Sequence, residues 1–310
     1  MENQFIIYGA GKRGVSWYNF LKQNNLNDNI YGFCDKNYKN IQYVDDKKVY
    51  SYEEVKKLDL PFFVSIVDKD MRNYAIKFLN DNGNIVENDM SKLLNVDTVE
   101  YNRMYCAFYH IDNMNEYFSK GESAEWLDVY WGESSLFYQM FKKLDITEII
   151  ELAVGRGRHV QKYIDKANSV TVVDIIQKNI DICKERYKNY DNIKYYCNNG
   201  YDLSKLSDNS YTAVFSYDAM VHFEMLDIYN YLKEMYRVLK NGGCALIHHS
   251  NNHSDYKASF QNAVQGRNYM SKDLFAYLAY RAGFEIVEQH VIDWKPDKDL
   301  DCISLIKKKI

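Results

Sequence analysis

Short apolar runs alternate with amphipathic segments along the whole chain. The runs typical of buried strands lie at residues 5–8, 30–34, 61–67, 149–154, 170–173, 193–197, 212–216, 244–248, 284–287 and 301–306. Between them apolar residues recur at helical spacing, as in Ile176, Ile180, Cys183 and Tyr187. Strands that alternate with helices form parallel sheets with helices on both faces. The pattern therefore predicts an α/β protein with doubly wound sheets, and the last two runs predict a terminal antiparallel hairpin.

Two of these runs enter glycine turns, which mark the starts of two separate domains. Residues 9–14 follow the first run, and residues 155–157 follow the run at 149–154. We expect one Rossmann-like domain at 1–97 and a second at 98–310. The first part of the second domain, about 98–145, is expected to form a helical lid.

The second glycine turn has the chemistry of a site for a large cofactor. Gly155 and Gly157 leave bare backbone where a strand turns into a helix, so that a cofactor meets no Cβ atom there. Asp174 ends the next strand, and a carboxylate at that place can accept hydrogen bonds from both hydroxyls of a ribose. This signal alone fits either a dinucleotide or an adenosyl cofactor.

Later segments resemble class I S-adenosyl-L-methionine (SAM) methyltransferases. The resemblance lies in residues 215–224, FSYDAMVHFE, and 237–243, RVLKNGG, and it covers roughly residues 100–310. Three further segments are similar to a bacterial subgroup associated with surface-polysaccharide and sugar modification; they lie at 248–251, 267–271 and 292–294. The resemblance implies that the second domain transfers methyl groups from SAM.

The resemblance also implies a set of cofactor-binding residues: Glu151, Ala153, Gly155, Gly157, Asp174, Ile175, Asn199, Gly200, Tyr201 and Ser216. Glu151 is expected to face the methionine end of SAM. Ala153 stands where the family usually has its first glycine, and an alanine is tolerated there if its φ is negative. Asn199 stands where an adenine-binding aspartate is common, and its amide oxygen is expected to accept a hydrogen bond from the adenine amine.

A sugar hydroxyl is too weakly acidic to attack a methyl group unaided, so a general base is expected at the carboxyl ends of the fourth and fifth strands. His222 is the first candidate, because a neutral imidazole is available near pH 7. His249 is the second, and Asp218 is expected to orient the base or to contact the substrate. His248 should point to the opposite face of its strand.

The acceptor itself is expected to meet three other side chains. Tyr130 and Trp131 lie in an aromatic segment that can stack on a sugar or on a sulfonium. Arg267 can clamp a phosphate or a carboxylate of the acceptor.

The first domain carries a complete G-x-G-x-x-G motif between a strand and a helix. It resembles the nucleotide-sugar-binding domain of bacterial sugar acyltransferases, and the residues that carry this expectation are Gly9, Gly11, Lys12, Arg13, Gly14 and Asp35. Free amides at a helix N-terminus favour a pyrophosphate, and the two basic side chains add positive charge. The alternative is a Rossmann module that only packs or dimerises.

Composition excludes several other functions. The formal net charge is −4 and the basic residues are dispersed, which argues against a nucleic-acid substrate. No apolar run is long enough to span a membrane and no signal peptide is visible, so a cytoplasmic protein is expected. The six cysteines and seven histidines show no metal-ligand spacing, and no metal is expected. Association into a homo-oligomer is left open.

The sequence thus predicts a SAM-dependent O-methyltransferase that acts on a sugar or a nucleotide-linked sugar in surface-polysaccharide biosynthesis. Three alternatives remain: an N-methyltransferase acting on an amino sugar, an NAD-dependent oxidoreductase or epimerase-like enzyme that uses the first glycine motif, and a non-catalytic binding scaffold. The oxidoreductase is disfavoured because no Tyr-x-x-x-Lys pair follows the first domain at the usual place.

Overall fold

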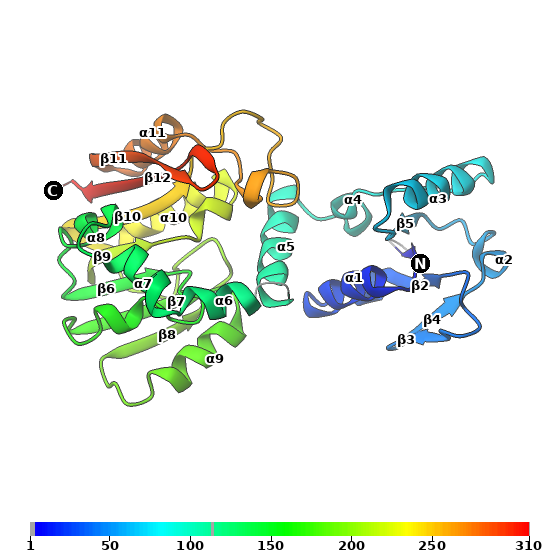
Figure 1. Cartoon of the computed structure of the whole chain (residues 1–310), viewed down its shortest axis with the longest axis horizontal. Coiled ribbons are helices and arrows are strands. Elements are labelled where there is room, and N and C mark those ends of the chain that lie inside the picture. The colour runs from blue at the N-terminus through cyan, green and yellow to red at the C-terminus, as the bar shows by residue number, and fades with distance from the viewer. Residues whose placement is uncertain (1–3, 113–114, 310) are drawn as a thin grey trace. The chain divides into compact units, whose positions relative to one another are not determined.

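The computed structural model describes residues 4–112 and 115–309, and the chain forms two compact units, 1–108 and 109–310 (Figure 1). The sequence placed the boundary after residue 97. The difference arises within helix α5 (Thr98–Asp112), because Tyr101 and Phe108 are buried in the core of the first unit.

The first unit is a small parallel sheet with helices on both faces. Its elements are β1 (Phe5–Tyr8), α1 (Lys12–Gln23), β2 (Ile30–Cys34), β3 (Tyr43–Val44), β4 (Lys47–Tyr50), α2 (Tyr52–Val55), β5 (Phe62–Val64), α3 (Lys69–Asp81) and α4 (Met90–Leu94). The strand order is β3-β4-β2-β1-β5, and only β3 and β4 pair in antiparallel fashion. Three of the strands match the predicted runs closely.

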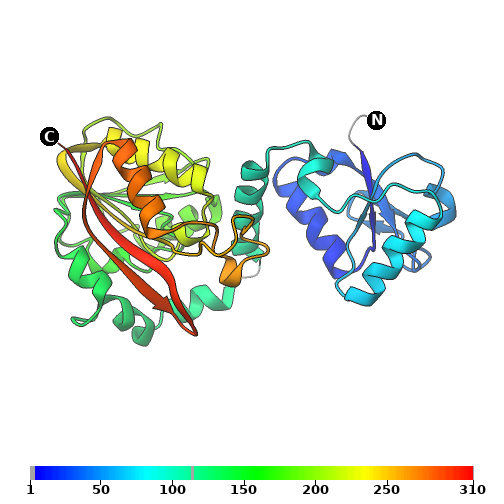
Figure 2. The same cartoon turned by 90° about the horizontal axis from the view of Figure 1, so that it is seen from above.

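The second unit is built on a seven-stranded sheet. Its strands are β6 (Glu148–Leu152), β7 (Ser169–Asp174), β8 (Ile193–Cys197), β9 (Tyr211–Ser216), β10 (Leu239–Ser250), β11 (Phe284–Trp294) and β12 (Asp297–Lys308). The strand order is β11-β12-β10-β9-β6-β7-β8, and all neighbours are parallel except those of β12. The predicted doubly wound sheet and terminal hairpin are therefore confirmed, and Figure 2 shows the long β11–β12 pair, at the red end of the colour scale, crossing the near face of this unit.

Helices cover the sheet because each carries an apolar stripe. They are α6 (Asn115–Gly121), α7 (Ala124–Trp131), α8 (Leu136–Phe141), α9 (Gln177–Arg186), α10 (Met225–Val238) and α11 (Lys272–Ala282), with short 3-10 turns at Val160–Lys162, Met220–His222 and Val264–Gly266. On α10 the stripe is fully buried at Ile228, Leu232 and Met235. The helix expected directly after the second glycine turn is only the 3-10 turn Val160–Lys162.

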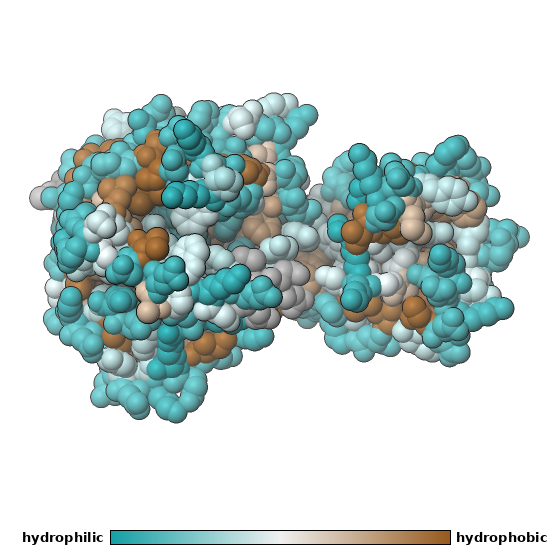
Figure 3. Space-filling model, viewed as in Figure 1, coloured by the Kyte–Doolittle hydropathy of each residue, from teal (hydrophilic) through white to brown (hydrophobic). Residues whose placement is uncertain are grey.

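The surface is mostly polar. In the space-filling view, hydrophilic residues cover most of both units and the hydrophobic residues form scattered patches (Figure 3). Among the described residues, no helix combines the length and the apolar character that crossing a membrane requires.

Candidate cofactor and catalytic site

The turn after β6 consists largely of left-handed backbone. Ala153 has a φ of 59°, Gly155 of 56° and Gly157 of 79°. The condition under which alanine is tolerated at this position, a negative φ, is therefore not met. The Val154 amide donates to the Val173 carbonyl oxygen at 3.0 Å, which fixes the path of the turn and forces Ala153 into the left-handed region. An L-residue there carries a cost of about 1 kcal/mol, which glycine avoids.

Replacing Ala153 by glycine is therefore expected to raise the free energy of unfolding by about 1 kcal/mol. Urea denaturation measures the change. The matched control is Ala279→Gly in the middle of α11, which should lower it by about 1 kcal/mol because helical backbone gains nothing from glycine. A loss of stability in both variants would contradict the strained turn.

Asp174 at the end of β7 closes this turn. Its Oδ2 accepts from the Gly155 amide at 2.8 Å, and its Oδ1 accepts from the Ile176 amide at 2.8 Å and from Asn179 Nδ2 at 3.2 Å. Burial raises the pKa of Asp174 to about 6, against the lowering effect of these hydrogen bonds. A carboxylate has about four acceptor positions. One acceptor position of the Asp174 carboxylate remains for a ribose hydroxyl. The expected pair of hydrogen bonds to both ribose hydroxyls is therefore corrected to a single hydrogen bond.

The predicted adenine turn after β8 is also organised by its own backbone. Asn199 Oδ1 accepts from the amides of Tyr201 and Asp202, each at 3.1 Å, and its Nδ2 donates to the Asp202 carboxylate at 2.6 Å. Both lone pairs of the amide oxygen are thus occupied. The expectation that Asn199 accepts from the adenine amine is wrong for this structure, and Asn199 instead shapes the loop that carries Gly200, whose φ is 87°.

Glu151, which was expected to face the methionine end of SAM, lies in β6 with its carboxylate against Tyr163. It is buried and accepts from the Tyr163 hydroxyl at 2.6 Å. Burial raises the pKa of Glu151 to about 8, although the Tyr163 hydroxyl opposes the rise. The Glu151 carboxylate takes this position because the buried Tyr163 side chain lies next to it and supplies its hydrogen bond.

Glu151 should make stability depend on pH. Between about pH 4.5 and pH 8 the folded protein holds a proton that the unfolded chain releases, so the free energy of unfolding falls as the pH rises through this window. We expect Glu151→Gln to remove this fall and to be more stable than the wild type by about 2 kcal/mol at pH 8. Urea denaturation from pH 5 to pH 8 tests it, with Glu148→Gln on the same strand as control. Parallel curves for the wild type and Glu151→Gln would refute it.

The carboxyl ends of β6, β7 and β9 form the region called here the cofactor crevice. Ser216 at the end of β9 tests whether this region fits a polar cofactor. Its side chain is 1% exposed, and its Oγ has no hydrogen-bond partner within the part of the chain that the structure describes. A buried hydroxyl without a partner costs about 1–3 kcal/mol, which a ligand can recover. Together with the one free acceptor position of Asp174, this unpaired hydroxyl fits the adenosyl and amino-acid groups of SAM.

Helix α6 covers the glycine turn. A Cβ atom added to Gly155 would lie 3.1 Å from the Phe118 ring. Tyr117 donates a short hydrogen bond to the Asp218 carboxylate. Arg158 pairs with the same carboxylate at 2.7 Å, and the Arg158 and Asp218 side chains are only 11% and 3% exposed. The sequence did not single out Tyr117 or Arg158 as site residues, because the contact joins positions far apart in the chain.

The two aromatic residues expected to meet the acceptor lie in the core instead. Trp131 donates its indole N–H to His159 Nδ1 at 2.9 Å and packs edge-on against Phe141. Tyr130 is 2% exposed and lies against the Arg158 guanidinium at 5.0 Å. Neither ring presents a face to a ligand, so both assignments are corrected to packing roles.

His222 lies in the 3-10 turn after β9 and is held in one tautomer. Its Nδ1 lies 2.9 Å from the Gly266 carbonyl oxygen, and a carbonyl can only accept, so Nδ1 carries the proton. Nε2 then has a free lone pair. Burial, followed by the neighbouring His110, lowers the pKa of His222 to about 3. The imidazole is therefore neutral at physiological pH, with the Phe260 ring at 5.3 Å.

The second candidate base is unavailable. His249 is fully buried and stacks on Phe275 with ring centroids 3.9 Å apart. Its two ring nitrogens contact the Ser250 carbonyl and the Ser304 hydroxyl, each at 2.8 Å. His249 points toward α11, away from the crevice, so its assignment as a base is wrong. His248 points to the opposite face, as predicted from strand alternation.

Two further residues act differently from their assignments. Asp218 pairs with Arg158 and Tyr117, so the expected hydrogen bond that would orient His222 is absent from the described contacts. Burial alone would raise the pKa of Asp218, but Arg158 lowers it below its ordinary value. Arg267 is 3% exposed and holds Asp301 at 2.8 and 3.1 Å. It is not free to clamp an acceptor.

The glycine motif of the first unit has the geometry of a nucleotide turn. A Cβ atom on Gly14 would lie 2.0 Å from the Gly9 carbonyl oxygen, whereas one on Gly11 would meet nothing within 4 Å. Gly14 thus permits helix and strand to meet, and Gly11 leaves its approach open. Asp35 accepts from the Ala10 amide at 2.8 Å, which closes the turn but leaves acceptor positions unused. Lys12 and Arg13 are exposed beside it.

Comparisons with known proteins agree with this geometry. A family model described as a methyltransferase domain matches residues 150–247. A structure of a complex from Haloferax volcanii, between the Trm112 methyltransferase activator and a chain described as a methyltransferase, is 15% identical, covers 66% of this chain and 98% of its own, and has a TM-score of 0.50. A SAM-dependent methyltransferase from Methanosarcina mazei is 16% identical, covers 56% of this chain and 99% of its own, and has a TM-score of 0.47. One from Mesorhizobium loti is 14% identical, covers 56% of this chain and 97% of its own, and has a TM-score of 0.45. A comparison with curated protein sequences found no match.

The second unit has the fold of class I methyltransferases, and residues 150–247 within it match a methyltransferase-domain model. Its sheet order and terminal hairpin, its glycine turn and the matched residues 150–247 all lie in the same unit. The second unit therefore carries a methyltransferase domain.

Proposed function

We propose that the protein transfers the methyl group of SAM to a hydroxyl of a sugar or nucleotide-linked sugar used in surface-polysaccharide assembly. The single observation that carries the proposal is His222. Its Nδ1–H is fixed by the Gly266 carbonyl, so its Nε2 lone pair is available to accept a proton. A hydroxyl acceptor needs such a base, whereas a neutral amine already has a lone pair with which to attack.

The surroundings of His222 suit a carbohydrate. The His110 and Phe260 rings lie with centroids 5.3 Å from the His222 imidazole, and aromatic faces pack well against the C–H groups of a sugar. Burial keeps His222 neutral, so its Nε2 is unprotonated, although the same burial makes this nitrogen a weaker base than a free imidazole. SAM, when bound, supplies a methyl group already activated by its sulfonium. The protein's task is then to align the acceptor and to exclude water.

The first unit supports a nucleotide-linked acceptor. Its open Gly11 backbone, the N-terminus of α1 and the exposed Lys12 and Arg13 suit a pyrophosphate, and Asp35 retains acceptor positions for a ribose hydroxyl. A nucleotide sugar contains both groups. The resemblance of the second unit to sugar-modifying methyltransferases points to the same class of acceptor.

The test is methyl transfer from radiolabelled SAM to a panel of nucleotide sugars, amino sugars and free sugars. His222→Gln is expected to lower kcat by about 100-fold or more while leaving the affinity for S-adenosylhomocysteine, measured by calorimetry, within about twofold. His253→Gln is the matched control, because His253 is an exposed histidine of a nearby loop. Full activity of His222→Gln would overturn the assignment of the base. Transfer to amino groups alone would favour the N-methyltransferase.

A further inference from the structure

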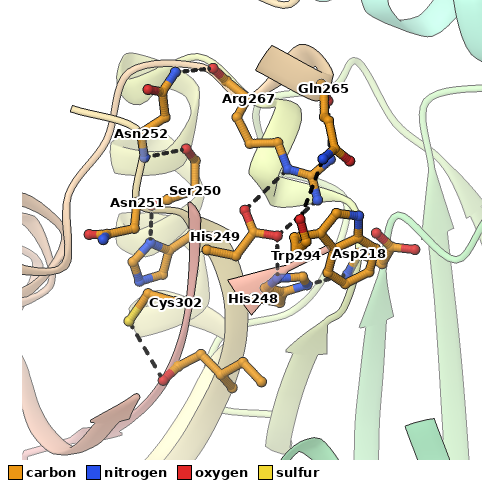
Figure 4. A network of polar contacts seen from close by, with 12 residues as sticks. Asp218, His248, His249, Ser250, Asn251, Asn252, Gln265, Arg267, Trp294 and Cys302 are labelled. Atoms are coloured by element: carbon orange, nitrogen blue, oxygen red, sulfur yellow. Dashed lines mark hydrogen bonds and ion pairs between the residues drawn. The ribbon is translucent and has the colours of Figure 1, made fainter. Parts of the chain in front are cut away.

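A continuous chain of polar contacts runs from Arg267 to the main chain of Asp218, behind the cofactor crevice. Arg267 Nε and Nη2 donate to the two oxygens of Asp301 at 3.1 and 2.8 Å, and Asp301 lies 3.1 Å from His248 Nε2. The side chains of Arg267 and Asp301 are 4% and 0% exposed. Figure 4 shows Arg267, His248 and Asp218 gathered around the ring of Trp294. The Arg267 guanidinium lies 5.0 Å from that ring.

The contacts of His248 determine its tautomer. The Asp218 amide donates to Nδ1 at 3.0 Å, so Nδ1 must carry a lone pair. Nε2 faces the Asp301 carboxylate, which can only accept, so Nε2 carries the proton. A carboxylate partner on the far nitrogen favours the tautomer with the proton on Nε2, and the bidentate Arg267 holds that carboxylate in place.

The hydrogen bond to Nδ1 falls on a strained residue. Asp218 has a φ of 59°, a left-handed conformation that a residue other than glycine adopts at a cost of about 1–2 kcal/mol. Such strain persists only where surrounding contacts hold it. We infer that His248 is a positioning residue, which holds the Asp218 main chain in this conformation, and that Asp301 and Arg267 fix the tautomer that makes this possible.

The held conformation has a consequence at the cofactor crevice. It directs the Asp218 carboxylate to Arg158 beside the glycine turn and to Tyr117 on α6. The same helix places Phe118 against Gly155. His248 thus supports the cover of the SAM site without touching it. The inference concerns the cofactor site only, so it stands or falls independently of the proposed acceptor.

Two variants separate the functions of the two ring nitrogens. In His248→Asn the amide oxygen replaces Nδ1 as acceptor for the Asp218 amide, but nothing reaches Asp301. In His248→Gln the longer amide can donate to Asp301 in place of Nε2, but the Asp218 amide loses its acceptor. We expect the affinity for S-adenosylhomocysteine to stay within about twofold to threefold in the first variant and to fall about tenfold in the second, the effect of one buried hydrogen bond.

Calorimetry with S-adenosylhomocysteine, well below the melting temperature of each variant, gives the comparison. Equal affinities in the two variants, or a weaker one in His248→Asn, would overturn the inference, because a purely structural histidine would not distinguish them. Nitrogen-15 spectra of histidine-labelled wild-type protein provide a measurement that needs no variant. The spectra should show an unprotonated Nδ1 and a protonated Nε2 for His248, and the reverse pattern would overturn it.

Discussion

Asp174→Ala is expected to abolish measurable binding of S-adenosylhomocysteine. The carboxylate gathers three donors, from Gly155, Ile176 and Asn179, and so joins the glycine turn to the end of β7. Hydrogen bonds to a charged acceptor contribute about 1.5–3 kcal/mol each. The loss of the turn and of the remaining ribose contact should therefore weaken binding by at least about 100-fold, measured by calorimetry at pH 7.5.

The control for this variant is Asp181→Ala on α9. The Asp181 side chain is 61% exposed and pairs only with side chains of its own helix, Gln177 and Lys184, so its loss should leave affinity unchanged. Circular dichroism of Asp174→Ala shows whether the domain still folds. A folded Asp174→Ala variant that binds with wild-type affinity would remove Asp174 from the cofactor site.

Asp301→Asn is expected to lower the free energy of unfolding by about 3–5 kcal/mol, because it leaves Arg267 buried without a counter-charge. Burial alone would raise the pKa of Asp301, but hydrogen bonds from His248 and Arg267 lower it to about 2. The folded pKa lies below the ordinary value of 3.8, so this stabilisation is fully present above about pH 4 and is lost as the pH falls toward 2.

Urea denaturation at pH 7 and at pH 3 tests both parts of the prediction. The difference between wild type and Asp301→Asn should be large at pH 7 and smaller at pH 3. Asp299→Asn is the control: Asp299 is exposed, has a φ of 52°, and asparagine tolerates that conformation, so a change below about 0.5 kcal/mol is expected. A difference that does not vary with pH would rule out the ion pair as its source.

The sequence predicted the order of strands and helices because that order depends on local apolar periodicity. It missed features that depend on backbone geometry. The strand expected at 244–248 is β10, which extends over Leu239–Ser250: β12 pairs with Cys244–Ser250, and Leu239 pairs with Tyr211 of β9. The sequence could not decide the conformation of Ala153, because residue type gives only a preference for φ, whereas here the Val154 amide is hydrogen-bonded to β7.

The site was predicted less well than the fold, for a physical reason. The hydrogen-bond partners of the buried polar side chains are set by the tertiary fold and are distant in the chain, so local sequence patterns do not reveal them. His248 and Asp301 are separated by 53 positions, and Tyr117 and Asp218 by 101. Arg267 was therefore predicted to bind the acceptor, although in the structure it is paired with the buried carboxylate of Asp301. Strand alternation did place His248 and His249 on opposite faces, because that rule is local.

The insertion of β12 between β10 and β11 has a consequence for synthesis on the ribosome. Strands β10 and β11 are synthesised before β12. In the finished sheet β12 lies between them and pairs with both. Until β12 emerges, the nascent chain exposes an open strand edge, the kind of surface that attracts chaperones or other nascent chains. Asp301 arrives on that same strand. The pairing of β12 therefore closes this edge of the sheet and brings Asp301 to Arg267 in the same step.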